Sequence, residues 1–168
     1  MNRSKRFVFL SFCATAQGVR AQGIVRKYPA IITPVTEMLT RHKINMVQMP
    51  CPELIFDGFC RRPCHKTHYD KVSNRAVCRQ LAQTVVGQMI LFKDNGNELM
   101  AVLGIDFSPS CAVDLIYGEK RQHLRGSGIF VEELQSLMHK QSLRVPMIGI
   151  RLYQMEDTLK QLRELLER

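Results

Sequence analysis

The sequence has few of the residues and patterns that mark several large classes of protein. Only 10 glycines and 7 prolines occur in 168 residues, which excludes a collagen-like or other fibrous chain. No apolar run approaches the ~20 residues that a membrane-spanning helix needs. Neither an internal repeat nor a low-complexity segment is visible, and a hydrophobic content of 45% excludes a disordered chain. These absences predict one compact domain over residues 1–168, without a linker.

Basic side chains outnumber acidic ones. Lys and Arg total 24 against 15 Asp and Glu, which gives a formal net charge of +9. An excess of this size favours polyanions or anionic small molecules as partners. The net charge says nothing about the fold.

The chain contains six cysteines. A chain of this length builds a core without disulfides, so reduced thiols or metal-bound thiolates are the better interpretation, and a cytoplasmic location is expected. The N-terminus leaves an alternative, because basic residues 2–6, apolar residues 7–10 and the Ala-Thr-Ala of residues 14–16 imitate a secretion signal. The same apolar run reads equally well as a first buried strand.

Short apolar runs alternate with amphipathic stretches along the chain. The predicted strands are residues 6–11, 45–49, 98–106 and 146–150. The predicted helices are residues 33–42, 70–92, 129–138 with Ser127 as N-cap, and 155–166. Strands that alternate with helices imply right-handed crossovers. The expected fold class is therefore α/β, a single-domain three-layer, Rossmann-like mostly parallel sheet with helices on both faces.

Three cysteines share one position relative to the predicted strands. Cys13 follows the first strand, Cys51 the second and Cys111 the third, whereas Cys78 lies inside the long helix as a small buried hydrophobe. Ligand sites in open α/β sheets form at the carboxyl ends of the strands, so these three thiols are expected to converge. Three thiolates indicate a soft metal, either zinc or an iron–sulfur cluster with one open position. Three unrelated buried cysteines remain the alternative on spacing alone.

Motifs around these cysteines resemble the 2-thiouracil desulfurase (TudS) family, in its branch of TudS-related desulfidases. The specific pieces are Pro50-Cys51-Pro52-Glu53 and Ser108-Pro109-Ser110-Cys111. Weaker pieces are Phe12-Cys13, Gly58-x-x-Arg61-x-Pro63, Tyr69-Asp70, Gly104-Ile105-Asp106 and Gly128-Ile129-Phe130. The resemblance runs from about residue 5 to about residue 150, nearly the whole chain.

The resemblance implies a cofactor and a reaction. Cys13, Cys51 and Cys111 would bind a [4Fe-4S] cluster with one iron free of protein ligands. That iron would bind the sulfur of a thiocarbonyl, as in 2-thiouracil, and make the ring carbon open to water, so that sulfur leaves as hydrogen sulfide. The chain is thus expected to be a C–S bond hydrolase, a desulfidase acting on a thiolated small molecule.

Glu53, Ser108 and Ser110 are the candidate catalytic residues. Glu53 would move a proton to the departing sulfur, and the two serines would hydrogen-bond the substrate or the cluster. Asp106, at the end of a buried strand, is a further candidate. The alternatives are an ion pair of Glu53 with Arg61 or Arg62, or its place at a helix N-terminus, and ordinary turn chemistry for the serines.

The sequence departs from the family pattern beside the first and last cysteines. Phe12, Phe107 and Ala112 stand where the family often has His, Gly and Gly, and an Asn after the first cysteine is missing. These changes crowd the expected pocket and leave the three thiols intact. They bear on the identity of the substrate more than on cluster binding.

Other functions compete with desulfuration. Cys60, Cys64, His65 and His68 offer four zinc ligands at an unusual spacing. Basic residues that are expected near the same rim favour a nucleic-acid-binding protein, although few aromatics lie among them: Arg61, Arg62, Lys66, Lys120, Arg121, His123 and Arg125. A thiolated nucleobase, nucleotide or RNA as substrate would account for both the basic residues and the expected iron–sulfur cluster. A sulfur carrier or sensor without catalysis is the remaining alternative, and no membrane partner is expected.

Overall fold

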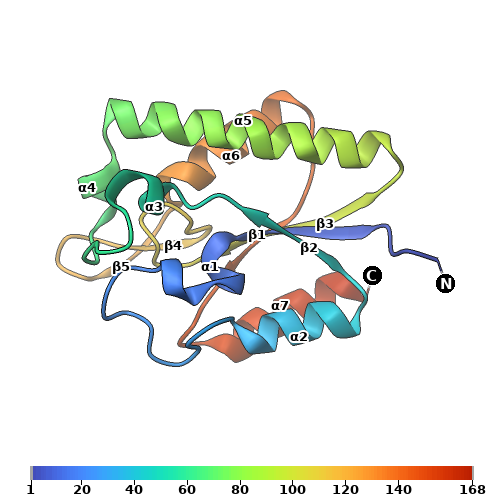
Figure 1. The fold of residues 1–168 in the computed structure, drawn as a ribbon, viewed down its shortest axis with the longest axis horizontal. Helices are drawn as coiled ribbons and strands as arrows, with labels where there is room; N and C mark the ends of the chain where they lie inside the picture. Colours follow the sequence, from blue (N-terminus) through green and yellow to red (C-terminus); the bar gives the residue numbers. More distant parts are fainter. Residues whose placement is uncertain (1, 168) are drawn as a thin grey trace.

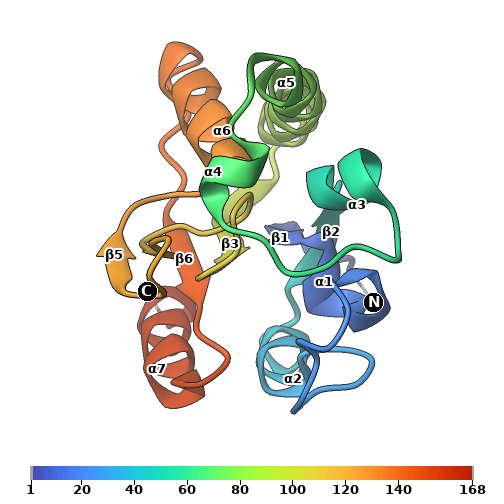
Figure 2. The same ribbon diagram turned by 90° about the vertical axis from the view of Figure 1, so that its left-hand side faces the viewer.

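The computed structural model describes residues 2–167, which form a parallel sheet between two layers of helices (Figures 1 and 2). The sheet has four strands in the order β2-β1-β3-β6, and all three pairings are parallel. The strands are β1 (Arg6–Ser11), β2 (Asn45–Met49), β3 (Glu98–Ile105) and β6 (Met147–Ile150). The predicted three-layer, Rossmann-like α/β class is confirmed.

Four helices cover the two faces of the sheet. Figure 1 shows α2 (Thr33–Arg41) and α7 (Met155–Leu166) on one face, with α5 (Val72–Asp94) and α6 (Ile129–Lys140) on the other. Short elements fill the connections at the carboxyl edge of the sheet. These are α1 (Phe12–Thr15), the 3-10 turn η1 (Gln17–Val19), α3 (Pro52–Asp57), α4 (Lys66–Tyr69) and the antiparallel hairpin of β4 (Leu115–Tyr117) and β5 (His123–Arg125).

The N-terminal apolar run is an inner strand of the sheet. Val8 and Leu10 pack into the layer of α2 and α7, whereas Phe9 packs into the layer of α5 and α6, and all three are fully buried. Because β1 is covered on both faces, its sequence is continuously apolar instead of alternating. The segment that imitates a secretion signal is therefore part of the core of this fold.

Two local predictions were wrong. Ser127 does not cap α6, because the helix begins after Gly128 and the Ser127 hydroxyl donates to the Val113 carbonyl at 2.7 Å. The polar connection of residues 108–128 contains the hairpin of β4 and β5, which the sequence did not predict. Its residues are half-buried or exposed, so they carry no burial pattern that marks a strand.

None of the helices within residues 2–167 is long and apolar enough to cross a membrane.

Candidate active site

The strand order places the three predicted cysteines at one edge of the sheet. Cys13 lies in α1 directly after β1, Cys51 is the N-cap residue of α3 after β2, and Cys111 follows β3. Strands β2, β1 and β3 are neighbours and parallel, so their carboxyl ends lie side by side. The chain leaves β1 toward β2 on one side and later returns to β3 on the other, which is the reversal of strand order where α/β proteins bind ligands.

The three thiols also influence one another electrostatically. Burial is the largest cause that raises the pKa of each thiol, to about 12 for Cys13 and well above the ordinary range for Cys111. The neighbouring Cys51 raises the pKa of both Cys13 and Cys111 further, and Glu53 adds to the effect on all three. A bound cation would stabilise the thiolates, which are the metal-binding form.

Glu53 joins three segments of the site. It lies in the first turn of α3, and its side chain is 13% exposed. Its Oε1 accepts hydrogen bonds from Ser108 Oγ at 3.0 Å and Ser110 Oγ at 2.6 Å, and its Oε2 lies 3.5 Å from Arg61 Nε. The predicted ion pair with Arg61 is therefore present, and the same carboxylate also holds both candidate serines.

The two serines differ in their contacts. Ser110 is fully buried, and its Oγ lies 3.6 Å from Cys111 Sγ as well as beside Glu53. Its single proton serves one of these two acceptors at a time. The Ser108 oxygen accepts the amide N–H groups of Ser110 at 3.3 Å and Cys111 at 3.0 Å, so it shapes the turn that carries the thiol.

Arg61 belongs to the site, although the sequence indicated only an ion-pair partner for Glu53. Its side chain is 3% exposed, and its Nη1 donates to the Gly58 carbonyl at 2.9 Å. Its Nη2 lies 4.0 Å from Cys51 Sγ. A buried guanidinium between a carboxylate and a thiol fixes both groups and offsets negative charge on them. The spacing Gly58-x-x-Arg61 was the available signal.

Asp106 holds the loop that carries Cys111. Its side chain is fully buried, and its Oδ1 accepts the amides of three consecutive loop residues, Val113, Asp114 and Leu115, at 3.0–3.3 Å. Its Oδ2 accepts from Arg151 Nε at 3.1 Å. Gly149 lies directly against this carboxylate. Both oxygens are occupied by these bonds, which assigns Asp106 to loop geometry rather than to proton transfer.

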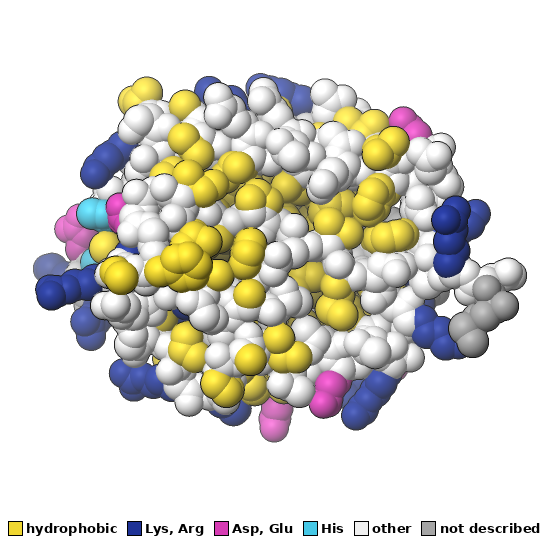
Figure 3. All heavy atoms as spheres, viewed as in Figure 1, with side chains coloured by type: hydrophobic (Ala, Val, Ile, Leu, Met, Phe, Trp, Pro, Cys, Tyr) yellow, Lys and Arg dark blue, Asp and Glu magenta, His cyan; other side chains and the backbone are white. Residues whose placement is uncertain are grey.

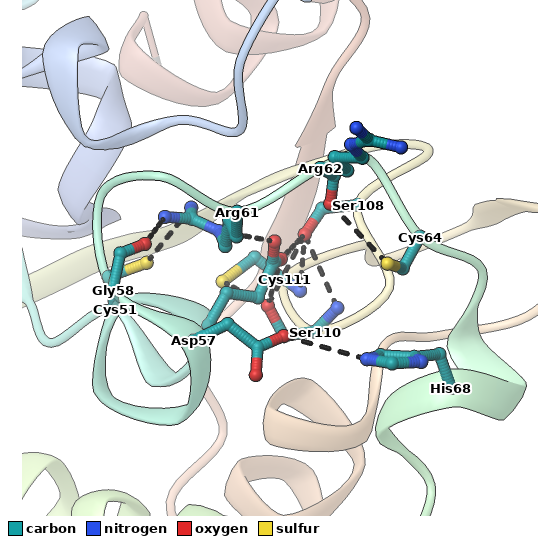
Figure 4. A network of polar contacts seen from close by, with 11 residues as sticks. Cys51, Asp57, Gly58, Arg61, Arg62, Cys64, His68, Ser108, Ser110 and Cys111 are labelled. Carbon is teal, nitrogen blue, oxygen red and sulfur yellow. Dashed lines mark hydrogen bonds and ion pairs between the residues drawn. The ribbon is translucent and has the colours of Figure 1, made fainter.

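The grouping predicted for zinc is not formed. Cys60 is exposed, the Cys64 thiol donates to the Arg62 carbonyl at 3.4 Å, and His68 Nε2 lies 3.5 Å from Asp57 Oδ2 (Figure 4). Across the described chain, no three His, Cys, Asp or Glu side chains are arranged to hold a metal ion.

Cys13, Cys51 and Cys111 fit an iron–sulfur cluster as a donor set. Thiolates are the ligands that iron–sulfur clusters take, and irons at separate corners are bound by ligands that stand farther apart than those of a single ion. The arginines beside them also fit, because a cluster with three thiolates carries negative charge. Arg61 lies beside Cys51, and Arg20 lowers the pKa of Cys13.

The hairpin of β4 and β5 forms one wall of a hollow of about 550 Å³ beside this site. The opposite wall is formed by His65 and the first residues of α4, including Lys66, so the two basic segments do approach one another. Figure 3 shows Lys, Arg and His side chains gathered at this end of the molecule. The residues that line the hollow are His65, Lys66, Thr67, Asp70, Ile116, Tyr117, Gly118, Glu119, Lys120, Gln122 and Leu124.

An aromatic cluster, which the sequence did not reveal, includes the pair of hairpin residues next to the turn, Tyr117 and His123. The Phe107 ring stacks on Tyr117 at 4.5 Å between centroids and lies 4.7 Å from the His123 ring. Phe107 has a φ of 69°, the left-handed region that favours glycine. This departure from the family pattern thus places its ring against the hairpin, and Ala112, the other departure in this loop, is fully buried.

Fold and site together define a Rossmann-like α/β protein with a thiol-rich centre at the carboxyl edge of its sheet. No protein-family model matches the chain. It is 25% identical over 146 residues to the uncharacterized protein MJ0003 of Methanocaldococcus jannaschii, which covers 87% of this chain and 86% of that protein.

Among solved structures, the chain is similar to the [4Fe-4S]-dependent thiouracil desulfidase TudS. The TM-score is 0.53 at 17% identity, and the match covers 95% of this chain and 99% of that one. The resemblance predicted from the motifs is confirmed at the level of the fold.

Proposed function

We propose that this chain is an iron–sulfur-dependent desulfidase, a single TudS-like domain over residues 1–168. It removes sulfur as hydrogen sulfide from a thiolated small molecule such as 2-thiouracil. One observation carries the proposal: Cys13, Cys51 and Cys111 follow three neighbouring parallel strands, and the half-buried Glu53 beside Cys51 binds two hydroxyls and a guanidinium. The likeness to TudS supports the same reading.

Cys13, Cys51 and Cys111 would hold the [4Fe-4S] cluster. When bound, such a cluster supplies an open iron that acts as a Lewis acid toward the substrate sulfur. The free state of all six cysteines agrees with thiols available for metal and with a cytoplasmic protein, which we assign on this ground.

Glu53 moves protons in this proposal, and Ser108 and Ser110 hydrogen-bond its carboxylate and the substrate or the cluster. The net reaction adds water to a thiocarbonyl and yields a carbonyl and hydrogen sulfide, so both protons of the water reach sulfur, and one of them passes through a protein group. Glu53 Oε1 accepts that proton and returns it, and Ser110 lies between this carboxylate and Cys111 Sγ. Arg61 keeps Oε2 oriented, so that Oε1 faces the serines.

The hollow formed by the hairpin and α4 supports a substrate that is larger than a free base, although Asp70 and Glu119 balance the charge of its two lysines. A thiolated nucleobase, nucleotide or RNA could enter it, and an anionic part would lie against Lys120, because Lys66 is paired with Glu132. The exposed basic hairpin also supports a second candidate function, nucleic-acid binding without catalysis.

Anaerobic reconstitution with iron and sulfide tests the proposal. We expect iron and sulfide to be retained after desalting, with thiolate-to-iron charge-transfer absorbance, and sulfide to be released from 2-thiouracil or another thiocarbonyl in a panel. A loaded protein that releases no sulfide would be a sulfur carrier or sensor. A protein that takes up no iron and binds RNA with a steep salt dependence would be a nucleic-acid-binding protein.

A further inference from the structure

Ser11, the last residue of β1, has a hydroxyl that the structure leaves unused. The residue is 1% exposed, and its Oγ is buried. Within residues 2–167 it has no hydrogen-bond partner, and Tyr69 is the one other residue whose buried side-chain oxygen shares that state. Leaving a buried hydroxyl unpaired costs free energy, so such an atom indicates a missing partner.

Ser11 also does not cap α1, which is the usual role of a serine just before a helix. Ser11 is the N-cap residue of α1, where a serine oxygen commonly accepts an amide N–H of the first helical turn. Here the side chain makes no capping bond. The hydroxyl is therefore neither a helix cap nor a bond within the core.

The position of Ser11 in the sheet shows what lies around it. Val8 and Leu10 face the layer of α2 and α7, so Ser11 faces the opposite layer together with Phe9, because side chains alternate along a strand. That layer contains Cys111. Cys13 follows Ser11 by two residues, in α1, and packs against the layer of α2 and α7.

The neighbouring strands complete the surroundings. Ser11 pairs with Met49 of β2, after which the chain reaches Cys51. On the other side, continuing the register of Leu10 with Leu103 places Gly104 beside Ser11. The Cys111 carbonyl packs onto Gly104 where a side chain would otherwise stand. Ser11 therefore lies between Met49 and Gly104 across the sheet. The chain continues from Met49 to Cys51, and the Cys111 backbone packs onto Gly104.

We propose that the Ser11 hydroxyl donates a hydrogen bond to a sulfur atom of the group held by Cys13, Cys51 and Cys111. The inference rests on the proposed function, because it needs a sulfur-rich cofactor as acceptor. A hydrogen bond to a cluster sulfur stabilises the more negatively charged, reduced state and raises the reduction potential. Ser11 is accordingly a positioning and tuning residue, and it takes no part in the proton transfer assigned to Glu53.

Because the Ser11 hydroxyl is unpaired, Ser11→Ala is expected to have opposite effects on the metal-free protein and on the loaded protein. In the metal-free protein, Ser11→Ala removes a buried polar atom that has no partner, so stability is unchanged or increased. In the loaded protein, the same substitution removes a hydrogen bond, so the cluster is retained less firmly and its potential falls.

The experiment uses the full chain, reconstituted anaerobically, with Ser11→Ala, Ser11→Thr and a control at an exposed serine of α6, Ser136→Ala. The readouts are iron content, the midpoint potential from a redox titration followed by electron paramagnetic resonance, and urea unfolding of the metal-free protein. We expect a more negative potential in Ser11→Ala alone, with the potential restored in Ser11→Thr, which keeps the hydroxyl. Metal-free Ser11→Ala should unfold at the same or a higher urea concentration than the wild type.

Equal potentials in fully loaded wild type and Ser11→Ala would overturn the inference and leave the proposed function standing. A Ser136→Ala shift as large as that of Ser11→Ala would also overturn it. A wild-type chain that retains no iron would overturn the proposed function and this inference with it.

Discussion

Glu53 Oε1 lies 2.6 Å from Ser110 Oγ, although the two residues are 57 positions apart in the chain. The bond joins the first turn of α3 to the loop after β3, and these two segments carry Cys51 and Cys111. The candidate proton carrier is therefore hydrogen-bonded between the two segments that carry two of the three candidate ligands, so a change in one affects the position of the others. Substitutions here need a measurement of the metal centre beside any measurement of turnover.

Replacing any one of Cys13, Cys51 and Cys111 by Ala should abolish cluster binding, because each removes one of three protein ligands. Cys60→Ala and Cys78→Ala should reconstitute normally, since Cys60 is exposed and Cys78 is a fully buried core residue of α5. Iron content and visible absorbance after anaerobic desalting measure the difference. Equal iron loss in all five variants would show that the ligand assignment is wrong.

Glu53→Gln should slow sulfide release by about 10²–10⁴-fold, the usual contribution of a general acid or base. The substitution is nearly isosteric, and an amide oxygen still accepts from the two serines. What it removes is the basic carboxylate and its ion pair with Arg61. The assay is sulfide release under single-turnover and steady-state conditions.

Two controls separate proton transfer from damage to the centre. The absorbance of the Glu53→Gln cluster should match that of the wild type, and Ser108→Ala should have a smaller effect than Glu53→Gln if the hydroxyl orients and does not transfer. Full activity in a loaded Glu53→Gln protein would remove Glu53 from the mechanism.

Gly149→Ala should destabilise the protein by about 1–3 kcal/mol, as expected for overpacking a core position. A methyl group there meets the Asp106 carboxylate, which cannot move because four hydrogen bonds hold it. Gly87→Ala is the matched control: Gly87 lies exposed within α5 with open space around it, and the substitution should stabilise the helix by about 0.5–1 kcal/mol. Urea unfolding of both variants checks the signs, and two equal effects would contradict the account of Asp106.

Stability should depend on Asp70 at neutral pH and lose that dependence in acid. The hydrogen bonds from Arg75, at 2.5 and 2.9 Å, lower the pKa of this carboxyl below its ordinary value of 3.8. Its contribution is therefore present above 3.8 and is lost as the pH falls through the lower pKa of the folded state. Unfolding free energies of wild type and Asp70→Asn should differ at about pH 7 and converge at about pH 2. A difference in unfolding free energy that grows as the pH falls would contradict the lowered pKa of Asp70.

The sequence predicted all four strands of the parallel sheet. Residues 6–11 and 45–49 were predicted with the observed bounds of β1 and β2, although only β1 is a buried apolar run, whereas β2 is an edge strand in which half-buried and exposed residues alternate up to Met49. It did not predict the strand order, which depends on packing between segments far apart in the chain. It also missed β4 and β5, whose side chains are too exposed to leave a pattern.

The candidate site was predictable where a residue lies beside a cysteine motif, as Glu53, Ser108 and Ser110 do. The sequence offered Arg61 as an ion-pair partner of Glu53, but it did not predict that Arg61 and Asp106 are buried, because the burial of a charged side chain depends on partners that the fold supplies. Arg61 is buried between Glu53 and the Gly58 carbonyl, and Asp106 is buried among loop amides and Arg151. A sequence shows such residues as charges, and only the tertiary structure shows that they are paired.

The inner position of β1 has a consequence for how the proposed metal centre would assemble in a cell. β1 is synthesised first, but its two neighbours in the sheet begin only at Asn45 and Glu98. Contacts between segments that are far apart in the sequence form slowly, so the Cys13 thiol stays exposed to solvent while the rest of the sheet is being synthesised. The three thiols come together only after Cys111 has emerged and folded. If the chain holds the proposed cluster, iron would therefore be delivered to a finished fold, and a nascent chain that stalls before this point would have no centre to load.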